Sequence, residues 1–225
     1  MTPMAPDASE LPSLAELARK ADFVALAQVR DTDYLRRREI PVSGSAYLQV
    51  LIPYKFELSA GQAVIEVYEK GLHEAECYFP NPDVFEEGRR YLLFLRRDPD
   101  EAERYRGLPE GCAIDVLVDG ANGYAVRMPV TGIRLSDTQT VQLERLARPM
   151  QFSDPYAVVA DDDLSPALRD AMLAAGQIVP YAPAATAEES DLPQAPAAVA
   201  ATRGWLYTQG IRLADFRTLL ETAQL

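Results

Sequence analysis

The sequence predicts a mainly β domain with one helix before its strands and a helical extension after them. The first observation is a run of five consecutive apolar residues at 91–95, flanked by two arginine pairs. A run so short and so uniformly apolar is typical of a buried strand. The second is the alternation of apolar residues over 47–56, which has the period of a strand. The third is a pair of helix-start signals at Ser13 and Ser136.

One helix and about six strands are expected in the N-terminal part of the chain. Ser13 and Glu16 form a capping box, so a helix begins there. The polar residues 31–45 indicate a long exposed connection, and Pro53 indicates an edge strand or a bulge. The strands are expected at 23–29, 47–56, 63–69, 91–95, 114–118 and 124–128.

Beyond residue 132 the sequence predicts helices rather than strands. Residues 133–179 are expected to be a helical segment, and residues 180–202, rich in Ala and Pro, are expected to be a linker. Residues 203–225 end in a helix that begins at Leu213 and carries an apolar stripe. That stripe must dock on the β domain or on a partner, and Trp205 is expected to pin this helix.

The order of the strands resembles the netrin and tissue-inhibitor-of-metalloproteinases group. Three short motifs carry the resemblance: Ala21-Asp22-Phe23-Val24, Tyr54-Lys55-Phe56 and Gly88-Arg89-Arg90-Tyr91-Leu92-Leu93. The resemblance covers roughly residues 13–132. It implies that residues 1–132 form an OB-like antiparallel barrel of five to six strands.

The same resemblance bears on function and compartment. Inhibitors of this group begin with Cys-x-Cys, which chelates the zinc of the protease, whereas this chain begins Met1-Thr2-Pro3. No residue of this chain therefore corresponds to the zinc-chelating residues of those inhibitors. Bacterial extracytoplasmic proteins of unassigned role look more similar to this chain, which implies a periplasmic or secreted protein. No signal peptide is visible in the sequence, so a cytoplasmic location is the alternative.

Charge and hydropathy exclude several classes of partner. The formal net charge is −12. A general nucleic-acid binder would instead carry a basic face, so no nucleic-acid partner is expected. No apolar run approaches the roughly 20 residues that a bilayer-crossing helix needs, so no membrane span is expected.

The chain has two cysteines, Cys77 and Cys112. An even pair fits one disulfide in an oxidising compartment, and this is the preferred interpretation. The alternative is a pair of unrelated buried thiols, because free cysteine behaves as a small hydrophobe.

The search for catalytic, cofactor-binding and metal-binding residues yields none to assign. His73 is the only histidine, and one histidine with two distant cysteines falls short of a zinc site. Asp161 belongs to a run of three aspartates, interpreted as an acidic entrance to a helix rather than a Ca²⁺ loop. Asp31, Asp33 and the Asp161 run remain as candidates for a carboxylate-only active site.

Exposed aromatic residues are the remaining lead, because OB barrels often bind ligands across one sheet face. The tyrosines that could form such a patch are Tyr47, Tyr54, Tyr68 and Tyr78, although filling of the core is the preferred interpretation. The expected function is a non-enzymatic protein-interaction module without a cofactor, whose partner the sequence does not identify. The alternatives are an assembly subunit that docks through its C-terminal helix and a carboxylate-based hydrolase.

Overall fold

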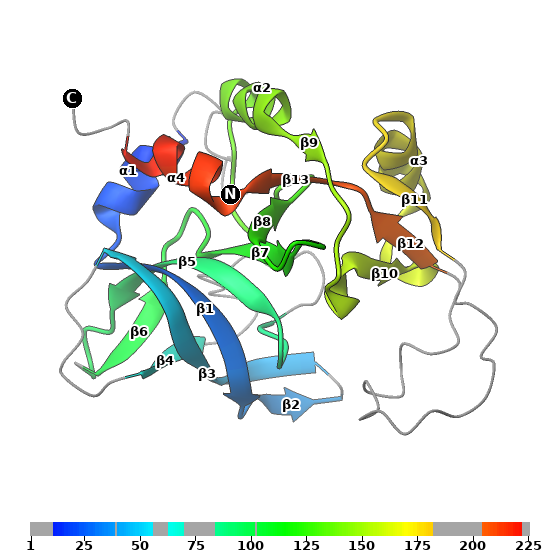
Figure 1. Cartoon of the computed structure of the whole chain (residues 1–225). Coiled ribbons are helices and arrows are strands. Elements are labelled where there is room, and N and C mark those ends of the chain that lie inside the picture. The colour runs from blue at the N-terminus through cyan, green and yellow to red at the C-terminus, as the bar shows by residue number, and fades with distance from the viewer. Residues whose placement is uncertain are drawn as a thin grey trace, which may run out of the picture.

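The computed structural model describes residues 11–38, 40–55, 63–69, 84–101, 103–181 and 204–221 (Figure 1). His73, Cys77, Tyr78 and nearly all of the expected linker lie outside these ranges. Within them, no helix combines the length and the apolar character needed to cross a bilayer.

The chain is mainly β, as predicted, with an N-terminal and a C-terminal helix. The described α-helices are α1 (Leu14–Lys20), α2 (Asp137–Leu146), α3 (Pro166–Ala174) and α4 (Leu213–Glu221). The first strands are β1 (Phe23–Thr32), β2 (Leu35–Arg37), β3 (Ile40–Lys55), β4 (Val64–Glu69), β5 (Arg90–Arg97), β6 (Arg104–Gly107), β7 (Ala113–Val118) and β8 (Tyr124–Arg127). The later strands are β9 (Arg148–Pro149), β10 (Val158–Ala160), β11 (Ile178–Tyr181), β12 (Gly204–Tyr207) and β13 (Gln209–Arg212).

Five of the strands close into a barrel. β1 pairs with both β3 and β5, β3 pairs with β4, and β6 joins β4 to β5. All of these pairings are antiparallel except that of β4 with β6, which is parallel. This closed arrangement is consistent with an OB-like barrel.

The apolar run in β5 is buried on both of its faces. Tyr91, Leu93 and Leu95 belong to the core inside the barrel. Leu92 and Phe94 belong to a second core on the outer face. A strand covered on both sides needs apolar residues at every position, which explains why this segment shows no alternation.

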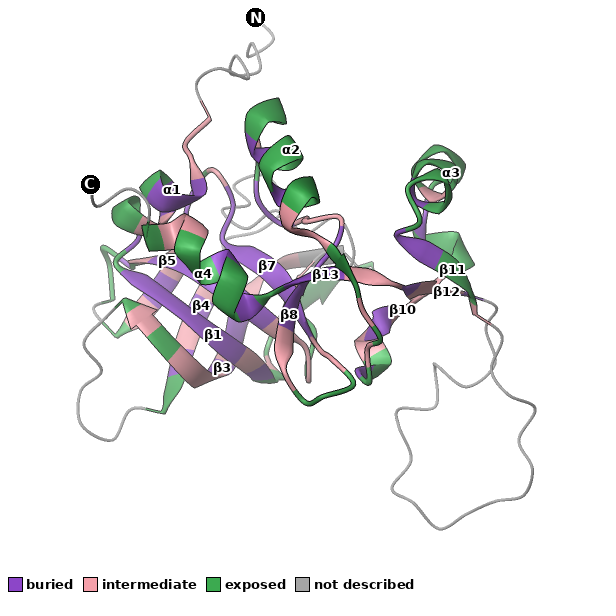
Figure 2. Cartoon of the chain, turned by 45° about the horizontal axis from the view of Figure 1, so that its top comes forward, coloured by how far each residue is buried: buried purple, intermediate pink, exposed green. Residues whose placement is uncertain are grey.

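The second core lies between the barrel wall and the terminal helices. α1 begins at Ser13, whose side chain accepts from the Glu16 N–H while Glu16 accepts from the Ser13 N–H, so the predicted capping box is present. α4 packs beside α1 over β1 and β5 (Figure 2). Phe216 of α4 is fully buried there, so the apolar stripe of the last helix docks within the chain.

The C-terminal part of the chain belongs to two sheets. β12 is the central strand of a small sheet in the order β10-β12-β11, and β13 pairs with β8 in the large sheet. α3 covers the small sheet over a core that includes Met172 and Tyr207. We refer to residues 155–181 together with β12 as the C-terminal lobe, which contains β10, β11, α3 and the 3₁₀ turns at Pro155–Ala157 and Asp161–Asp163 (Figure 1).

Several sequence-based expectations are wrong in detail. The expected exposed connection at 31–45 contains β2 and the first part of β3, which pair as a hairpin. β6 was not expected as a strand. The segment 133–179 contains α2 and α3, as expected, but also β9, β10 and the start of β11. Trp205 lies in β12 and contacts the core of the lobe rather than α4.

Candidate functional site

A cleft runs between the barrel and the C-terminal lobe. Its volume is about 140 Å³. Arg89 and Arg127 line it from the barrel side, and Tyr156, Leu168 and Tyr207 line it from the lobe. We call this feature the barrel–lobe cleft. It places two guanidinium groups opposite an apolar and aromatic wall.

Arg127 is the most deeply buried charge of the cleft, because only 6% of the residue is exposed. It is the last residue of β8. Its Nε and Nη2 donate to Oδ2 of Asp115 at 3.1 and 2.5 Å, and Nη2 also lies 2.7 Å from Thr131 Oγ1. Burial lowers the pKa of Arg127, but Tyr207 and Asp115 outweigh this effect and raise it. Arg127 therefore remains a cation.

Arg89 precedes β5 and reaches the cleft from the same wall. Its Nε donates to Oε2 of Glu86 at 2.5 Å, and its Nη1 lies 4.0 Å from Oδ1 of Asp115. Asp115 is thus the carboxylate that both arginines share. A buried charge is stable only where it is paired and hydrogen-bonded, and Asp115 meets this requirement for Arg127.

Both guanidinium groups are covered by a tyrosine ring from the lobe. Arg127 lies 4.5 Å from the centre of the Tyr207 ring, and Arg89 lies 4.8 Å from that of Tyr156. Such cation–π contacts stabilise a guanidinium over the ring and do not use its N–H groups as hydrogen-bond donors to oxygen. The lobe therefore fixes the orientation of the cations that the barrel supplies.

A buried carboxylate and a glycine fasten the lobe to the barrel beside the cleft. Asp154 accepts hydrogen bonds from Arg90 Nη1 at 3.0 Å, from the Val118 N–H at 3.1 Å and from the Tyr156 N–H at 3.0 Å. The Tyr156 hydroxyl donates to the backbone carbonyl before Gly88 at 2.6 Å. Gly88 has φ +83°, and a Cβ there would lie 2.5 Å from that hydroxyl. Gly88 thus leaves space for the Tyr156 side chain of the lobe.

The wall opposite the arginines is apolar and partly open to solvent. Met172 and Leu164 are buried in the lobe core, whereas Leu168 is 45% exposed. All three line the cleft, and Asp163 lines it as an exposed acidic residue. The cleft is therefore amphipathic, with donors on one side and an apolar surface on the other.

A larger groove of about 430 Å³ lies between α1, α4 and the end of β3. Two of its three basic residues, Lys55 and Arg217, are already engaged within the chain. Lys55 Nζ donates to the carbonyls of Ala18, Arg19 and Ala21 at the end of α1, at 3.1, 2.8 and 2.6 Å. Arg217 pairs with Glu221 at 2.6 Å. We therefore regard the barrel–lobe cleft as the stronger candidate.

The carboxylates considered for an active site are exposed: Asp31 and Asp33 lie at the end of β1 and just after it, and Asp161 lies in a separate 3₁₀ turn. Asp31 accepts from the Thr32 N–H in β1, and Asp33 accepts from the Ser45 N–H at 2.6 Å. Asp161 lies in a 3₁₀ turn of the lobe and accepts from Trp205 Nε1 at 2.6 Å, which lowers the pKa of Asp161. These contacts are structural.

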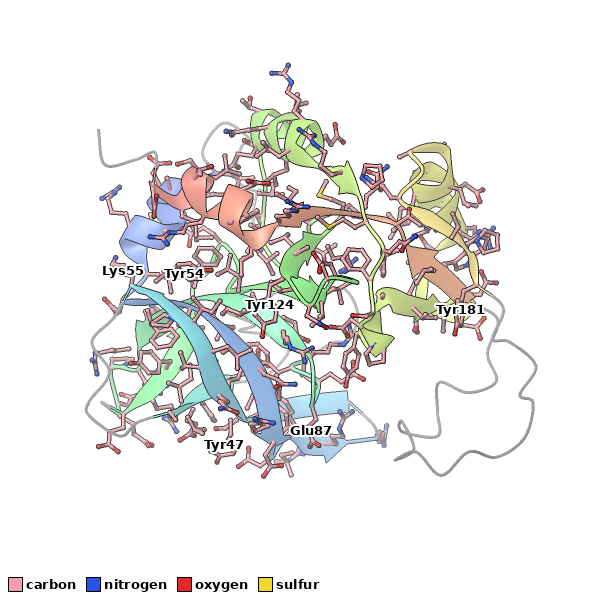
Figure 3. The ribbon with its side chains drawn as sticks, viewed as in Figure 1. Tyr47, Tyr54, Lys55, Glu87, Tyr124 and Tyr181 are labelled. Atoms are coloured by element: carbon pink, nitrogen blue, oxygen red, sulfur yellow. The ribbon has the colours of Figure 1, made fainter. Side chains whose placement is uncertain are left out.

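Three of the four tyrosines expected to fill the core or form a patch are described, and of these Tyr54 packs against the second core. Ala46, Leu48, Ile65 and Val67 fill the barrel, so Tyr47 and Tyr68 lie on the outer face of β3 and β4 and are half-buried. Tyr54 lies near the C-terminal end of β3, whereas Tyr47 lies in the middle of that strand (Figure 3). Core filling is wrong for Tyr47 and Tyr68.

A buried carboxylate, Asp98, holds the turn between β5 and β6. It forms ion pairs with Arg104 at 2.6 Å and Arg106 at 3.0 Å, and it accepts from the Asp100 N–H. Burial raises the pKa of Asp98, but the hydrogen bonds from Asp100, Arg106 and Arg104 outweigh it and lower the pKa to about 2. The Arg104 guanidinium also stacks 4.3 Å from the Tyr68 ring. This cluster maintains the hairpin.

Cys112 is fully buried, and the described part of the chain contains no free cysteine. Its predicted partner, Cys77, lies outside the described residues. The Cys77–Cys112 disulfide therefore stays a prediction.

Sequence reasoning did not identify the cleft. Arg127 was included in an expected strand, and Arg89 was interpreted only as a flank of the apolar run. One signal was available: Arg127 stands between Val126 and Met128, and a lone charge within an apolar strand indicates a buried polar partner.

The fold and this site define a closed β-barrel protein with an amphipathic cleft at the junction of two lobes. Comparison with protein-family models, curated proteins and solved structures gave no match.

Proposed function

We propose that the chain is a non-enzymatic protein-interaction module that receives its partner at the barrel–lobe cleft. The observation that carries this proposal is the juxtaposition of exposed Leu168 with the two arginines. An apolar centre with flanking arginine and tyrosine side chains is the composition found at protein interfaces.

The two alternative functions have less support. Assembly through the last helix was suggested by its apolar stripe, which is now accounted for by packing against α1 and the second core. Hydrolysis by carboxylates was suggested by Asp31, Asp33 and Asp161, which make structural contacts.

The proposed compartment is the periplasm or the exterior of the cell, in keeping with the resemblance to netrin-like bacterial proteins. The closed strand order is consistent with an OB-like barrel, and the cysteine pair fits an oxidising environment. Thiol titration of unfolded, never-reduced protein should detect no reactive thiol. Two reactive thiols would remove the disulfide and the main support for export.

Site-specific photocrosslinking in the producing cell tests the interaction. A photoreactive residue replaces Leu168, and the same residue at Leu35 is the matched control because Leu35 is 57% exposed in β2, outside the cleft. We expect a defined adduct at position 168 alone, and binding of the purified adduct partner should be lost in Leu168→Glu. The proposal fails if position 168 gives no adduct, or gives the same adducts as position 35.

A further inference from the structure

The two arginines of the barrel–lobe cleft have hydrogen-bonding capacity to spare. A guanidinium has five N–H donors. Arg127 engages Asp115 and Thr131 through Nε and Nη2, and Arg89 engages Glu86 through Nε. Within the described ranges, Nη1 of Arg127 and Nη2 of Arg89 have no hydrogen-bond acceptor. Both residues line the cleft, so an acceptor that enters it can reach them.

The arrangement favours a planar anion. The Tyr207 and Tyr156 rings lie 4.5 and 4.8 Å from the two guanidinium carbons, and the hydrogen bonds to Asp115 and Glu86 fix both groups, so their positions are set before a ligand arrives. Paired, pre-oriented guanidiniums bind carboxylates by charge-assisted hydrogen bonds, which are stronger than neutral ones. Two internal carboxylates already engage these cations: Asp115 contacts both, and Glu86 pairs with Arg89. An incoming carboxylate would therefore bind through the remaining N–H donors rather than through an excess of positive charge.

The size and the opposite wall restrict the ligand further. The cleft volume of about 140 Å³ is below the roughly 300–1,000 Å³ of pockets that bind cofactor-sized molecules. It suits one side chain of a larger partner. Leu168, Met172 and Leu164 provide an apolar surface next to the donors, which suits an apolar residue beside the acidic one.

We infer that the cleft binds an acidic peptide segment of a protein partner. A glutamate or aspartate carboxylate of that segment accepts hydrogen bonds from Arg89 and Arg127, and an adjacent apolar side chain rests on Leu168. This inference rests on the proposed function and names the chemistry of the partner. Asp163 at the cleft opposes the incoming carboxylate and reduces its affinity.

Methyl NMR on the full chain tests the inference with model peptides. The probe is acetyl-Gly-Glu-Leu-Gly-amide, and its matched control is the same peptide with Gln in place of Glu. The methyl groups of Leu168 and Met172 report on the cleft. We expect saturable shifts of these methyl signals with the Glu peptide and binding at least about tenfold weaker with the Gln peptide. Equal binding of the two peptides, or no saturable shift in the cleft methyl groups, overturns the inference.

Variants give the test a second readout that does not depend on the most buried arginine. Arg89→Gln should weaken binding of the Glu peptide about tenfold, and Asp163→Asn should strengthen its binding about twofold. Leu168→Glu should abolish binding, whereas Leu173→Glu should not change it, because Leu173 is 36% exposed on the same helix but does not line the cleft. Loss of binding in Leu173→Glu, or unchanged binding in Arg89→Gln with native circular dichroism, would contradict the assignment.

The outcomes separate this inference from the proposed function. A crosslinked partner at position 168 that competes equally with both peptides would support the interaction module and overturn the carboxylate preference. Preference for the Glu peptide with no crosslinked partner would support the carboxylate preference and overturn the interaction module. Isovalerate binding as tightly as the Glu peptide would overturn the peptide as the source of the carboxylate.

Discussion

Replacement of Arg127 by methionine should destabilise the protein strongly, because it leaves Asp115 buried without its main counterion. Asp115 is 9% exposed, and it would lose two hydrogen bonds from Arg127. Breaking one side of a buried ion pair costs about 3–5 kcal/mol. Arg89 Nη1 remains 4.0 Å from Asp115, so we expect Arg127→Met to cost about 3 kcal/mol.

The double variant Arg127→Met with Asp115→Leu should recover most of that loss. It removes both charges and fills the site with apolar side chains, a change that is often neutral or stabilising. We expect the double variant to lie within about 1 kcal/mol of the native protein. Urea unfolding can be followed by the fluorescence of Trp205, the only tryptophan, and by far-ultraviolet circular dichroism.

Arg217→Met is the matched control, because Arg217 pairs with Glu221 while its side chain is 58% exposed. An exposed pair contributes less than about 1 kcal/mol, so this variant should be nearly neutral. The reasoning is refuted if Arg127→Met lowers the free energy of unfolding no more than Arg217→Met does. It is also refuted if the double variant loses as much stability as the single variants Arg127→Met and Asp115→Leu lose in sum.

Three further predictions follow from the fold. Gly88→Ala should lower the free energy of unfolding by about 1–2 kcal/mol, because an L-residue is strained at positive φ and its Cβ would displace the Tyr156 hydroxyl. A shift of the urea midpoint, followed by Trp205 fluorescence, to lower urea would show this loss, and an unchanged midpoint would contradict it. Asp98→Asn should cost about 2 kcal/mol at neutral pH. Because the folded pKa of Asp98 is lowered to about 2 from about 4 in the unfolded chain, this contribution is present above pH ~4 and is lost as the pH falls toward ~2. Urea titrations at both pH values measure it, and a difference that persists at low pH would be inconsistent with it. Deletion of residues 204–225 removes β12, β13 and α4, so amide exchange should lose protection in β8 and β10 as well; retained protection there would disprove the pairing.

The sequence predicted the barrel better than the lobe, for physical reasons. The run at 91–95 and the alternation in β3 follow from burial, which leaves a periodic signal. β6 reads Arg-Tyr-Arg-Gly, and its arginines pair with Asp98 in the turn that precedes the strand. That sequence looks like a loop because four residues, two of them charged, are too few to display the apolar alternation of a strand.

The lobe and the cleft were missed for a related reason. β10 and β12 have three and four residues, too few to display a period. Arg89, Arg127, Tyr156 and Tyr207 come from four separate segments, and no local pattern links them. Only the pairing of strands that are distant in the chain brings them together.

The position of β12 and β13 has a consequence for biosynthesis. These strands are translated after β1 to β11, yet one is the middle of the small sheet and the other borders β8. While the nascent chain lacks them, β8, β10 and β11 have open edges, and such edges promote misassembly. We expect the protein to complete its folding only after residue 221 has left the ribosome, and to require protection by a chaperone until then.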